Sequence, residues 1–484
     1  MEERGRIPIG PPVANPLPSY WHEPKSPLAN VIEPEPDKGT HKYDYAIIGS
    51  GISGTMIAYN LLASDPAASI VMLEAREACS GATGRNGGHT KAASYRSYLQ
   101  HREELGKEEA LKIARLEYEN IMATHRLAEE LELDCGNKLC NTVDLIYDQE
   151  TFDIGKKSIE ALREDTNEDD QKEGGMAWYK TFSSDEATTQ FWASPTNDNP
   201  AVPEKEYLIG AFEYLAGRIN AYKFSTSILN LCTQKGLKLC TNTPVHKILP
   251  TPTSSYEVFT QYSTINARSI ILATNGYTPY LLPSLQSSIV PLRGQITAQR
   301  VSPSTSLPSL LPTTYSFIYK SGYEYMVPRP LADGSQHLVI GGGLARQPQD
   351  GISEYANIND GALHPEISTY LHGTLVGFLG KNWGDDDPVT RVVQEWTGIM
   401  GVTADGRPFV GEVPGMKGVW VSTGFNGHGM VLCVKAAEAL VQMVRGTEAR
   451  DLEWFPSSFL ISGERIERGR FRGRTDLGKP ENET

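Results

Sequence analysis

A glycine-rich turn between a strand and a helix is the feature that most constrains this chain. Residues 43–48 predict a short buried strand, and the motif GSGISG (49–54) follows it directly and opens an apolar-faced helix. A second strand ends at Glu74, 20 residues beyond Gly54. A strand, a glycine turn, a helix and an acidic residue at this spacing predict a βαβ unit that binds a dinucleotide.

Each residue type in this unit has a physical role. Gly49 permits the tight turn, Gly51 lets the backbone approach a pyrophosphate, and Gly54 lets the helix pack closely on the strand. The unpaired N–H groups at the helix N-terminus favour negative phosphate. Glu74 would accept hydrogen bonds from the adenosine ribose. NAD and FAD present the same ADP group, so this unit alone does not distinguish them.

The charge and cysteine content exclude several classes of protein. The net charge is −14 and no cluster of Lys and Arg is present, which argues against nucleic acid as a partner. The six cysteines are scattered without CxxC spacing, so we expect neither a metal site nor a disulfide framework. No apolar run reaches the roughly 18 residues of a membrane span, and the first residues do not resemble a secretory signal. We expect a cytoplasmic protein with a small-molecule partner; its oligomeric state is left open.

Four further motifs follow the βαβ unit in order. They are SGATGRNGGH (80–89), ATNGY (273–277), PLRGQ (291–295) and GFNGHGM (424–430). Together these motifs resemble the D-amino-acid oxidase and glycine oxidase superfamily of flavoproteins, with a texture similar to its γ-glutamylputrescine oxidase-like branch. The resemblance extends from Tyr43 to Gly446, and it implies FAD as the cofactor.

The motifs suggest how each segment would meet FAD. Small residues in 80–89 would let the backbone run along the flavin, with Arg85 supplying positive charge near phosphate or the reduced ring. A helix N-terminus after 424–430 would stabilise the negative charge of reduced flavin. By resemblance, Val245 flanks the adenine and Asp405 turns a loop back to the flavin. The predicted cofactor-binding residues are Gly49, Ser50, Gly51, Ile52, Ser53, Gly54, Glu74, Ala75, Arg76, Gly81, Ala82, Thr83, Arg85, Asn86, Gly87, Gly88, His89, Val245, Ala273, Thr274, Asn275, Gly276, Asp405, Gly424, Asn426, Gly427, His428, Gly429 and Met430.

Three departures from related enzymes bear on the chemistry. Where some relatives attach flavin through a cysteine or a histidine, this chain has Gly398 and Arg85, so we expect noncovalent FAD. Val431 stands where sarcosine oxidases hold the substrate carboxylate with a lysine, which makes a simple N-methyl amino acid a poorer candidate. The strand matched to the oxygen-activating lysine, residues 337–343, contains no lysine.

Four residues are candidates for catalysis. Tyr323 and Tyr325 would share one face of a strand, because alternate strand residues point the same way. His89 and His428 flank flavin motifs and could bind flavin, substrate or a proton. Ordinary packing is the alternative interpretation for all four.

We therefore predict an α/β fold, α+β overall, with a Rossmann-like FAD domain built from discontinuous segments and an antiparallel-sheet substrate domain. The family reaction transfers hydride from an amine or amino acid to flavin, giving an imine and, with oxygen, hydrogen peroxide. A flavin dehydrogenase with another acceptor and a noncatalytic FAD-binding protein are the alternatives. The predicted segments are an extended Pro-rich arm held by Tyr20 and Trp21 (1–40), the FAD domain (41–100, 207–290 and 395–447, with a helix over 207–235), the substrate domain (101–206 and 291–394, with loops between short elements over 148–205) and a polar C-terminal tail (448–484), loose over 467–484.

Overall fold

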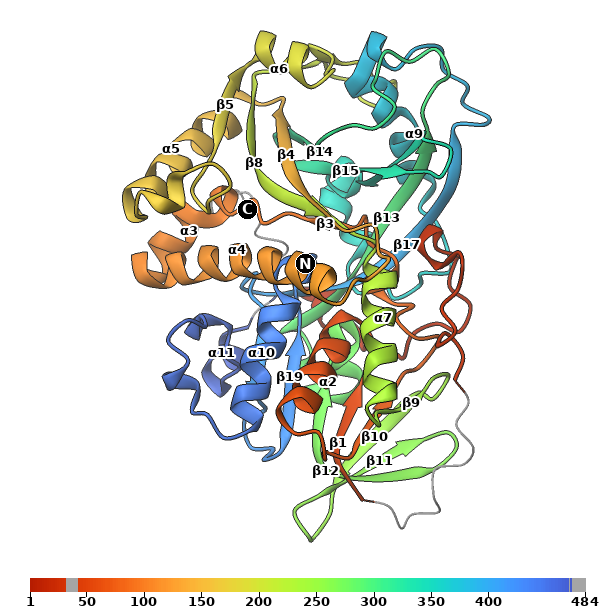
Figure 1. Ribbon diagram of the computed structural model, residues 1–484, viewed down its shortest axis with the longest axis vertical. Helices are drawn as coiled ribbons and strands as arrows, with labels where there is room; N and C mark the ends of the chain where they lie inside the picture. The colour runs from red at the N-terminus through yellow and green to blue at the C-terminus, as the bar shows by residue number, and fades with distance from the viewer. Residues whose placement is uncertain (32–41, 470, 472–484) are drawn as a thin grey trace.

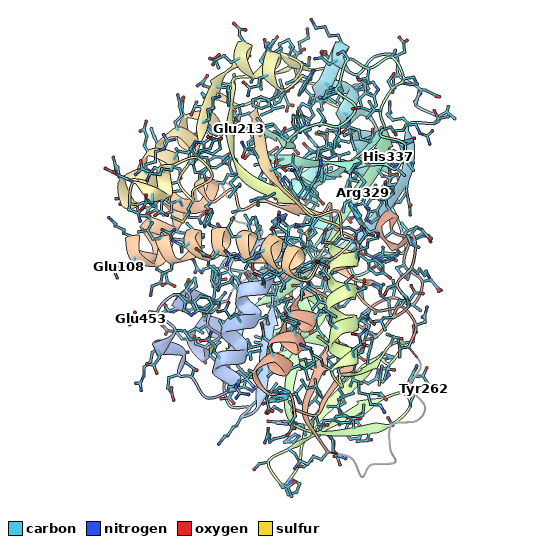
Figure 2. All side chains as sticks on the ribbon, in the orientation of Figure 1. Glu108, Glu213, Tyr262, Arg329, His337 and Glu453 are labelled. Carbon is cyan, nitrogen blue, oxygen red and sulfur yellow. The ribbon has the colours of Figure 1, made fainter. Side chains whose placement is uncertain are left out.

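The chain forms two halves, each built on its own sheet. The computed structural model describes residues 1–31, 42–469 and 471. Figure 1 shows the two halves stacked along the long axis, with helix α4 (Lys107–Glu130) crossing between them. Figure 2 shows side chains filling both halves and the region between them.

An eight-stranded sheet forms the half that carries the first glycine motif. β1 (Lys42–Ile48) lies at its centre, with β2 (Ile70–Leu73) on one side and β12 (Thr264–Leu272) on the other, both parallel to it. The order is β10-β11-β12-β1-β2-β9, and β19 also pairs with β12 and with β18. The remaining strands are β9 (Lys238–Cys240), β10 (Val245–Pro250), β11 (Tyr256–Thr260), β18 (Phe409–Glu412) and β19 (Val419–Thr423).

The two faces of this sheet belong to different apolar clusters. Ile47 packs with three helices, α2 (Ile52–Ser64), α7 (Ala221–Gln234) and α10 (Cys433–Val444), whereas Ile48 packs with the β10–β11 side. Both residues are buried because this sheet is covered on both faces, which explains the continuous apolar run of β1. This arrangement confirms the predicted Rossmann-like unit.

A nine-stranded sheet forms the other half. Its order is β17-β13-β16-β15-β14-β4-β8-β3, with β5 on β8, and its pairs are antiparallel except β14 with β4. Its strands are β3 (His89–Thr90), β4 (Lys138–Ile146), β5 (Lys180–Ser183), β8 (Gly210–Arg218), β13 (Ile289–Arg300), β14 (Thr314–Tyr319), β15 (Gly322–Pro330), β16 (Gln336–Gly342) and β17 (Val392–Thr403). The other elements are α1 (Glu2–Gly5), α3 (Tyr95–Leu105), α5 (Gln149–Asp165), α6 (Ser184–Gln190), α8 (Thr278–Leu281), α9 (Pro365–Leu379), α11 (Gly463–Arg468), β6 (Thr196–Asn197) and β7 (Glu206–Tyr207).

Two predictions about secondary structure are wrong. The helix expected over 207–235 begins only at Ala221, and 210–218 is β8, which belongs to the nine-stranded sheet. Nearly all of β8 is buried, so it lacks the polar alternation that distinguishes a strand from a helix. Within 148–205, where loops between short elements are expected, α5 is a 17-residue helix, which Asp148 caps by accepting a hydrogen bond from the Thr151 N–H.

The ends of the chain pack more closely than predicted. Trp21 is only 4% exposed, and the described part of the arm contains α1 and a 3-10 turn, Tyr20–His22. Phe455 and Phe459, in the segment predicted as a polar C-terminal tail, are buried against the helices of the first half. Residues 32–40 of the arm and nearly all of 470–484 lie outside the described residues.

Candidate functional site

A cavity of about 530 Å³ lies between the two halves. One part of its wall comes from the βαβ unit, including Gly49, Gly51 and Glu74. Another part comes from β15 of the nine-stranded sheet, with Tyr323 and Tyr325. Its volume falls within the few hundred to about 1,000 Å³ that is usual for ligand and cofactor sites.

The glycine turn brings the N-terminus of α2 to this cavity. Gly49 has φ +103°, and a side chain there would also meet the Ala273 carbonyl oxygen at 2.6 Å. A methyl group at Gly54 would lie 2.0 Å from the Gly49 carbonyl oxygen, so only glycine allows this approach of helix and turn. Gly51 is the N-cap of α2 and supplies no side-chain cap, and the Thr83 hydroxyl accepts the Ile52 N–H at 2.9 Å. The next N–H groups of the first turn have no acceptor within the helix and are suited to a ligand.

Glu74 follows β2 and is held in place by backbone donors. One carboxylate oxygen accepts the Ser50 N–H at 3.0 Å and the Ser50 hydroxyl at 2.7 Å, and the other accepts the Arg76 N–H at 3.1 Å. Ser50 itself does not line the cavity. Its role in the structure is to orient the carboxylate that does.

Two arginines beside the cavity converge on one buried carboxylate. Arg76 donates from both terminal nitrogens to Asp360, at 2.9 and 3.0 Å, and Arg85 Nε lies 3.6 Å from the same carboxylate. Burial lowers the pKa of Arg76, but the hydrogen bonds and charge of Asp360 outweigh it and the net pKa is raised. Burial lowers the pKa of Arg85 to about 10, so both guanidiniums remain charged at neutral pH.

Arg85 also braces neighbouring segments. Its guanidinium donates to the carbonyl oxygens of Ser80, Thr397 and Leu17, at 2.8, 2.9 and 2.7 Å. The side chain is buried, and every one of these acceptors belongs to the protein. Arg85 therefore ties the 80–89 loop to β17 and to the N-terminal arm.

The loop at 424–430 reaches the cavity from the end of β19. Gly427, His428, Gly429 and Met430 line the cavity, whereas Asn426 holds the loop by accepting the Thr403 N–H at 2.8 Å. The helix expected to start at Met430 begins three residues later, because a 3-10 turn, Gly429–Val431, precedes α10.

Asn120 of α4 fixes this loop to the following helix. Its amide nitrogen donates to the Met430 carbonyl oxygen at 3.1 Å, and its amide oxygen accepts the Lys435 N–H at 3.0 Å. The side chain is fully buried. One helix between the two halves thus positions the cavity end of α10.

Aromatic and cationic side chains form the opposite wall. Tyr323 and Tyr325 both face the cavity, while Glu324 between them is fully buried on the other face of β15. The Arg96 guanidinium lies 3.9 Å from the centre of the Tyr323 ring, a cation–π contact. A methyl group at Gly87 would lie 2.4 Å from the Tyr325 ring, so Tyr325 rests directly on the 80–89 loop.

His89 and Lys91 are partly buried residues of the cavity wall. His89 Nε2 lies 2.7 Å from the Thr314 hydroxyl, and burial lowers its pKa well below the usual value, which keeps the ring neutral. Lys91 Nζ lies 2.5 Å from Asp144, which also accepts hydroxyl hydrogen bonds from Tyr95 and Tyr214 at 2.8 Å each. Burial lowers the pKa of Lys91 to about 8 against the opposing effect of Asp144.

The tautomer of His428 is set by the backbone. Its Nδ1 lies 3.0 Å from the Asn426 carbonyl oxygen, which can only accept a hydrogen bond. Nδ1 therefore carries a proton, and Nε2 is the basic nitrogen of the neutral ring.

Comparison with known proteins identifies the class of enzyme. Residues 44–443 match the family described as FAD dependent oxidoreductase, DAO. The chain belongs to this family. It is 25% identical over 436 residues to a probable oxidoreductase OrdL of Rhizobium meliloti, covering 89% of each protein. It is 26% identical over 198 residues to a glycine oxidase of Pseudomonas aeruginosa, covering 40% of this chain and 45% of that enzyme.

The fold agrees with this assignment. The solved structure of glycine oxidase from Geobacillus kaustophilus superimposes with a TM-score of 0.66 at 20% identity, covering 88% of this chain and 99% of that one. The chain is an FAD-dependent oxidoreductase, as predicted. The helix N-terminus that opens on a glycine, the acidic residue after β2 and the glycines that leave no room for side chains fit the dinucleotide of FAD.

Most residues predicted for FAD line this cavity. Of the predicted set, Ser50, Gly54, Gly88, Gly276, Gly424, Asn426 and Asp405 do not, and the first six shape the turns and loops around it. Asp405 lies apart from the cavity and accepts hydrogen bonds from Arg465 at 2.6 and 2.9 Å. It makes a turn, as expected, and it does not line this cavity.

Sequence reasoning missed part of the wall. The cavity residues that it did not select include Met1, Pro11, Pro12, Lys91, Arg96, Tyr277, Gln295 and Met400. Lys91 and Arg96 follow the 80–89 motif closely and could have been found by extending it. No motif marked Asp360 or the prolines of the arm as neighbours of the cofactor site.

No helix in residues 1–31, 42–469 and 471 is long and apolar enough to cross a membrane. Within the same ranges, no group of three or more His, Cys, Asp or Glu residues is arranged to hold a metal ion.

Proposed function

We propose that this enzyme oxidises a C–N bond of a small amine or amino acid. The observation that carries the proposal is that one cavity joins the dinucleotide motif to a wall of aromatic and cationic side chains. FAD bound there supplies the two-electron acceptor for hydride from the substrate carbon. The imine that results is hydrolysed by water, and with oxygen as the final acceptor the second product is hydrogen peroxide.

The protein would position the substrate and accept the proton that its ammonium group releases. Tyr323 and Tyr325 provide flat surfaces against which a small substrate packs, with Arg96 stacked on the first of them. An amine loses hydride readily only when its nitrogen is neutral. His428, whose basic Nε2 is set by the contact of Nδ1 with Asn426, is suited to accept the ammonium proton. His89 stays neutral and would orient neighbouring groups by hydrogen bonding.

We propose that FAD is held without a covalent bond. Gly398 and Arg85, which stand at the positions of covalent attachment in relatives, lie side by side, and a methyl group on Gly398 would be 3.0 Å from Arg85 Cβ. Cys433 also lines the cavity, but burial raises the pKa of its thiol far above neutral, so it is not a thiolate. Denaturation in acid should release all FAD into the supernatant, whereas flavin that stays with the polypeptide would contradict the proposal.

Oxygen is the proposed final acceptor because a buried cation lines the cavity. Lys91 is charged below its pKa of about 8, and a fixed positive charge in a site shielded from water stabilises the negative charge that oxygen acquires on reduction. Lys91, directly after β3, therefore supplies the positive charge that β16, which contains no lysine, does not.

The test is the visible spectrum of the holoenzyme during anaerobic addition of pooled amines and amino acids. Bleaching of the flavin bands with one pool, and their return together with hydrogen peroxide on admitting air, is the expected result. Bleaching that air reverses slowly, but an artificial acceptor reverses quickly, would replace the oxidase with a dehydrogenase. Bands that no amine bleaches would favour the noncatalytic FAD-binding alternative.

A further inference from the structure

The N-terminal strap, which we define as residues 1–31, lies outside the segment that matches the DAO family, 44–443. It nevertheless contributes Met1, Pro11 and Pro12 to the wall of the cofactor cavity. Figure 1 shows the chain starting near the middle of the view, and the red segment descends along the side of the molecule next to β17. The strap therefore runs from the cavity to the outside of both halves.

The strap backbone contacts the arginines that flank the dinucleotide site. The Val13 carbonyl oxygen accepts a hydrogen bond from Arg76 Nη1 at 3.3 Å, and the Leu17 carbonyl oxygen accepts one from Arg85 Nη2 at 2.7 Å. The Leu17 N–H in turn donates to the Asp360 carbonyl oxygen at 2.8 Å. The strap thus takes part in the network of two arginines and one buried carboxylate.

A second set of contacts holds the 80–89 loop. The Ser19 hydroxyl donates to the Gly84 carbonyl oxygen at 2.6 Å, and the Trp21 indole N–H donates to the Asn86 carbonyl oxygen. His22 packs so closely on Gly84 that a methyl group there would lie 2.3 Å from its Nε2. These contacts fix the 80–89 loop, which carries eight of the predicted cofactor residues.

The strap is also anchored to the nine-stranded sheet. The Tyr20 hydroxyl lies 3.0 Å from His337 Nδ1, and the Arg329 guanidinium lies 5.1 Å from the centre of the Trp21 ring. Arg329 and His337 pair across β15 and β16, and Figure 2 labels both in the upper half. One short segment therefore connects the cofactor loop, the arginine network and the substrate-side sheet.

We propose that the N-terminal strap is a part of the FAD site, closing over the bound cofactor and slowing its release. Pro11 and Pro12 restrict the backbone where it borders the cavity, which lowers the entropy lost when the strap closes. Binding of FAD and closure of the strap are thermodynamically linked, so each stabilises the other to the same extent. The proposal depends on FAD binding alone and is independent of which substrate is oxidised.

The first experiment is hydrogen exchange of the full-length wild-type chain with and without FAD. Amides of residues 13–22 should exchange more slowly in the FAD-bound protein, whereas those of α6, which lies far from the cavity in the upper half of Figure 1, should not change. Equal exchange of residues 13–22 in the two states would overturn the proposal.

The second experiment measures the rate at which FAD leaves the holoenzyme, from the rise of free-flavin fluorescence after dilution. The double variant Ser19→Ala/Trp21→Phe removes two hydrogen bonds to the 80–89 loop and should release FAD about tenfold faster. The control Arg6→Gln changes an exposed surface pair of the same strap and should match the wild type. A double variant that keeps its folded far-ultraviolet spectrum and releases FAD at the wild-type rate would contradict the proposal; if it fails to fold, the hydrogen-exchange result decides.

Discussion

The Asp360 carboxylate accepts hydrogen bonds from both terminal nitrogens of Arg76, at 2.9 and 3.0 Å, and both side chains are almost completely buried. Arg76 follows β2 by only a few residues, whereas Asp360 lies in the segment before α9, so the pair joins the two halves of the molecule. A buried bidentate pair of this kind fixes orientation as well as position. Glu74, two residues before Arg76, is held at the cavity by the same short segment.

Removing this carboxylate should destabilise the protein strongly. Asp360→Asn leaves Arg76 and Arg85 buried beside a neutral amide, and loss of one partner from a buried ion pair costs about 3–5 kcal/mol. Urea unfolding of the apoprotein measures the loss. Asp169→Asn, which removes the exposed pair with Lys172, is the control and should change stability by less than about 1 kcal/mol. Equal losses of stability in the two variants would show that the buried ion pair stabilises the protein no more than the exposed one.

A methyl group at Gly54 should prevent FAD binding. Gly54→Ala places a carbon atom 2.0 Å from the Gly49 carbonyl oxygen, so α2 and the glycine turn must move apart where the pyrophosphate would bind. Fluorescence titration should show FAD affinity reduced by at least about tenfold, or 1.4 kcal/mol. Gly463→Ala introduces the same methyl group where no atom lies within 4 Å, and it should bind FAD normally. Normal affinity in Gly54→Ala would remove the steric argument.

The local parts of this fold could be predicted from sequence because their signals are short-range. The turn at Gly49 and Gly51, the acidic Glu74 and the alternation of Tyr323 and Tyr325 each depend on a few neighbouring residues. The same reasoning failed at β8, because a strand buried on both faces has no periodicity that separates it from a helix.

The residues that sequence reasoning missed act over long separations. Asp360 meets Arg76 across 284 positions, and Asn120 meets Met430 across 310. A single aspartate or asparagine carries no pattern that marks such a partner. Arg85 shows the opposite case: its position beside the cavity was predicted, but its hydrogen bonds to three carbonyl oxygens of the protein were not.

His428 should contribute to catalysis through its protonation state. His428→Asn can still place an amide near the Asn426 carbonyl oxygen but lacks a basic nitrogen. Loss of a general base reduces rates by about 10²–10⁴-fold, so kcat/KM for an amine substrate should fall in that range in the FAD-saturated enzyme. Addition of free imidazole should restore part of the rate. An unchanged pH profile and rate would assign His428 a packing role.

Reoxidation by oxygen should depend on the charge of Lys91. The pKa of about 8 means that the positive charge is present at lower pH and is lost as pH rises through that value. Stopped-flow reoxidation of the reduced enzyme should therefore slow down above about pH 8. The double variant Lys91→Met/Asp144→Asn removes both buried charges together, which avoids an unpaired carboxylate, and its reoxidation should be slow and independent of pH. Fast reoxidation in this variant would show that oxygen reacts without the lysine.

The pH dependence of stability should include a contribution from Glu117 on α4. Burial raises the pKa of its carboxyl to about 7, against the lowering effect of a hydrogen bond from the Ser94 hydroxyl. A folded-state pKa above the unfolded value means that this group stabilises the protein below about pH 4.5, and that the contribution is lost as pH rises through 7. Glu117→Gln keeps an acceptor for Ser94 and has no charge to bury.

The variant should therefore become more stable than the wild type as pH increases from 5 to 8, by roughly 3 kcal/mol, because each pKa unit corresponds to about 1.4 kcal/mol. Urea unfolding of both apoproteins at several pH values measures this difference. Glu108→Gln, an exposed glutamate on the same helix that Figure 2 labels, is the matched control and should leave the pH profile as it is. Other buried acids, such as Glu324, are present in all three proteins, so the difference isolates Glu117. A constant gap between Glu117→Gln and wild type across this range would mean that the Glu117 carboxyl does not titrate there.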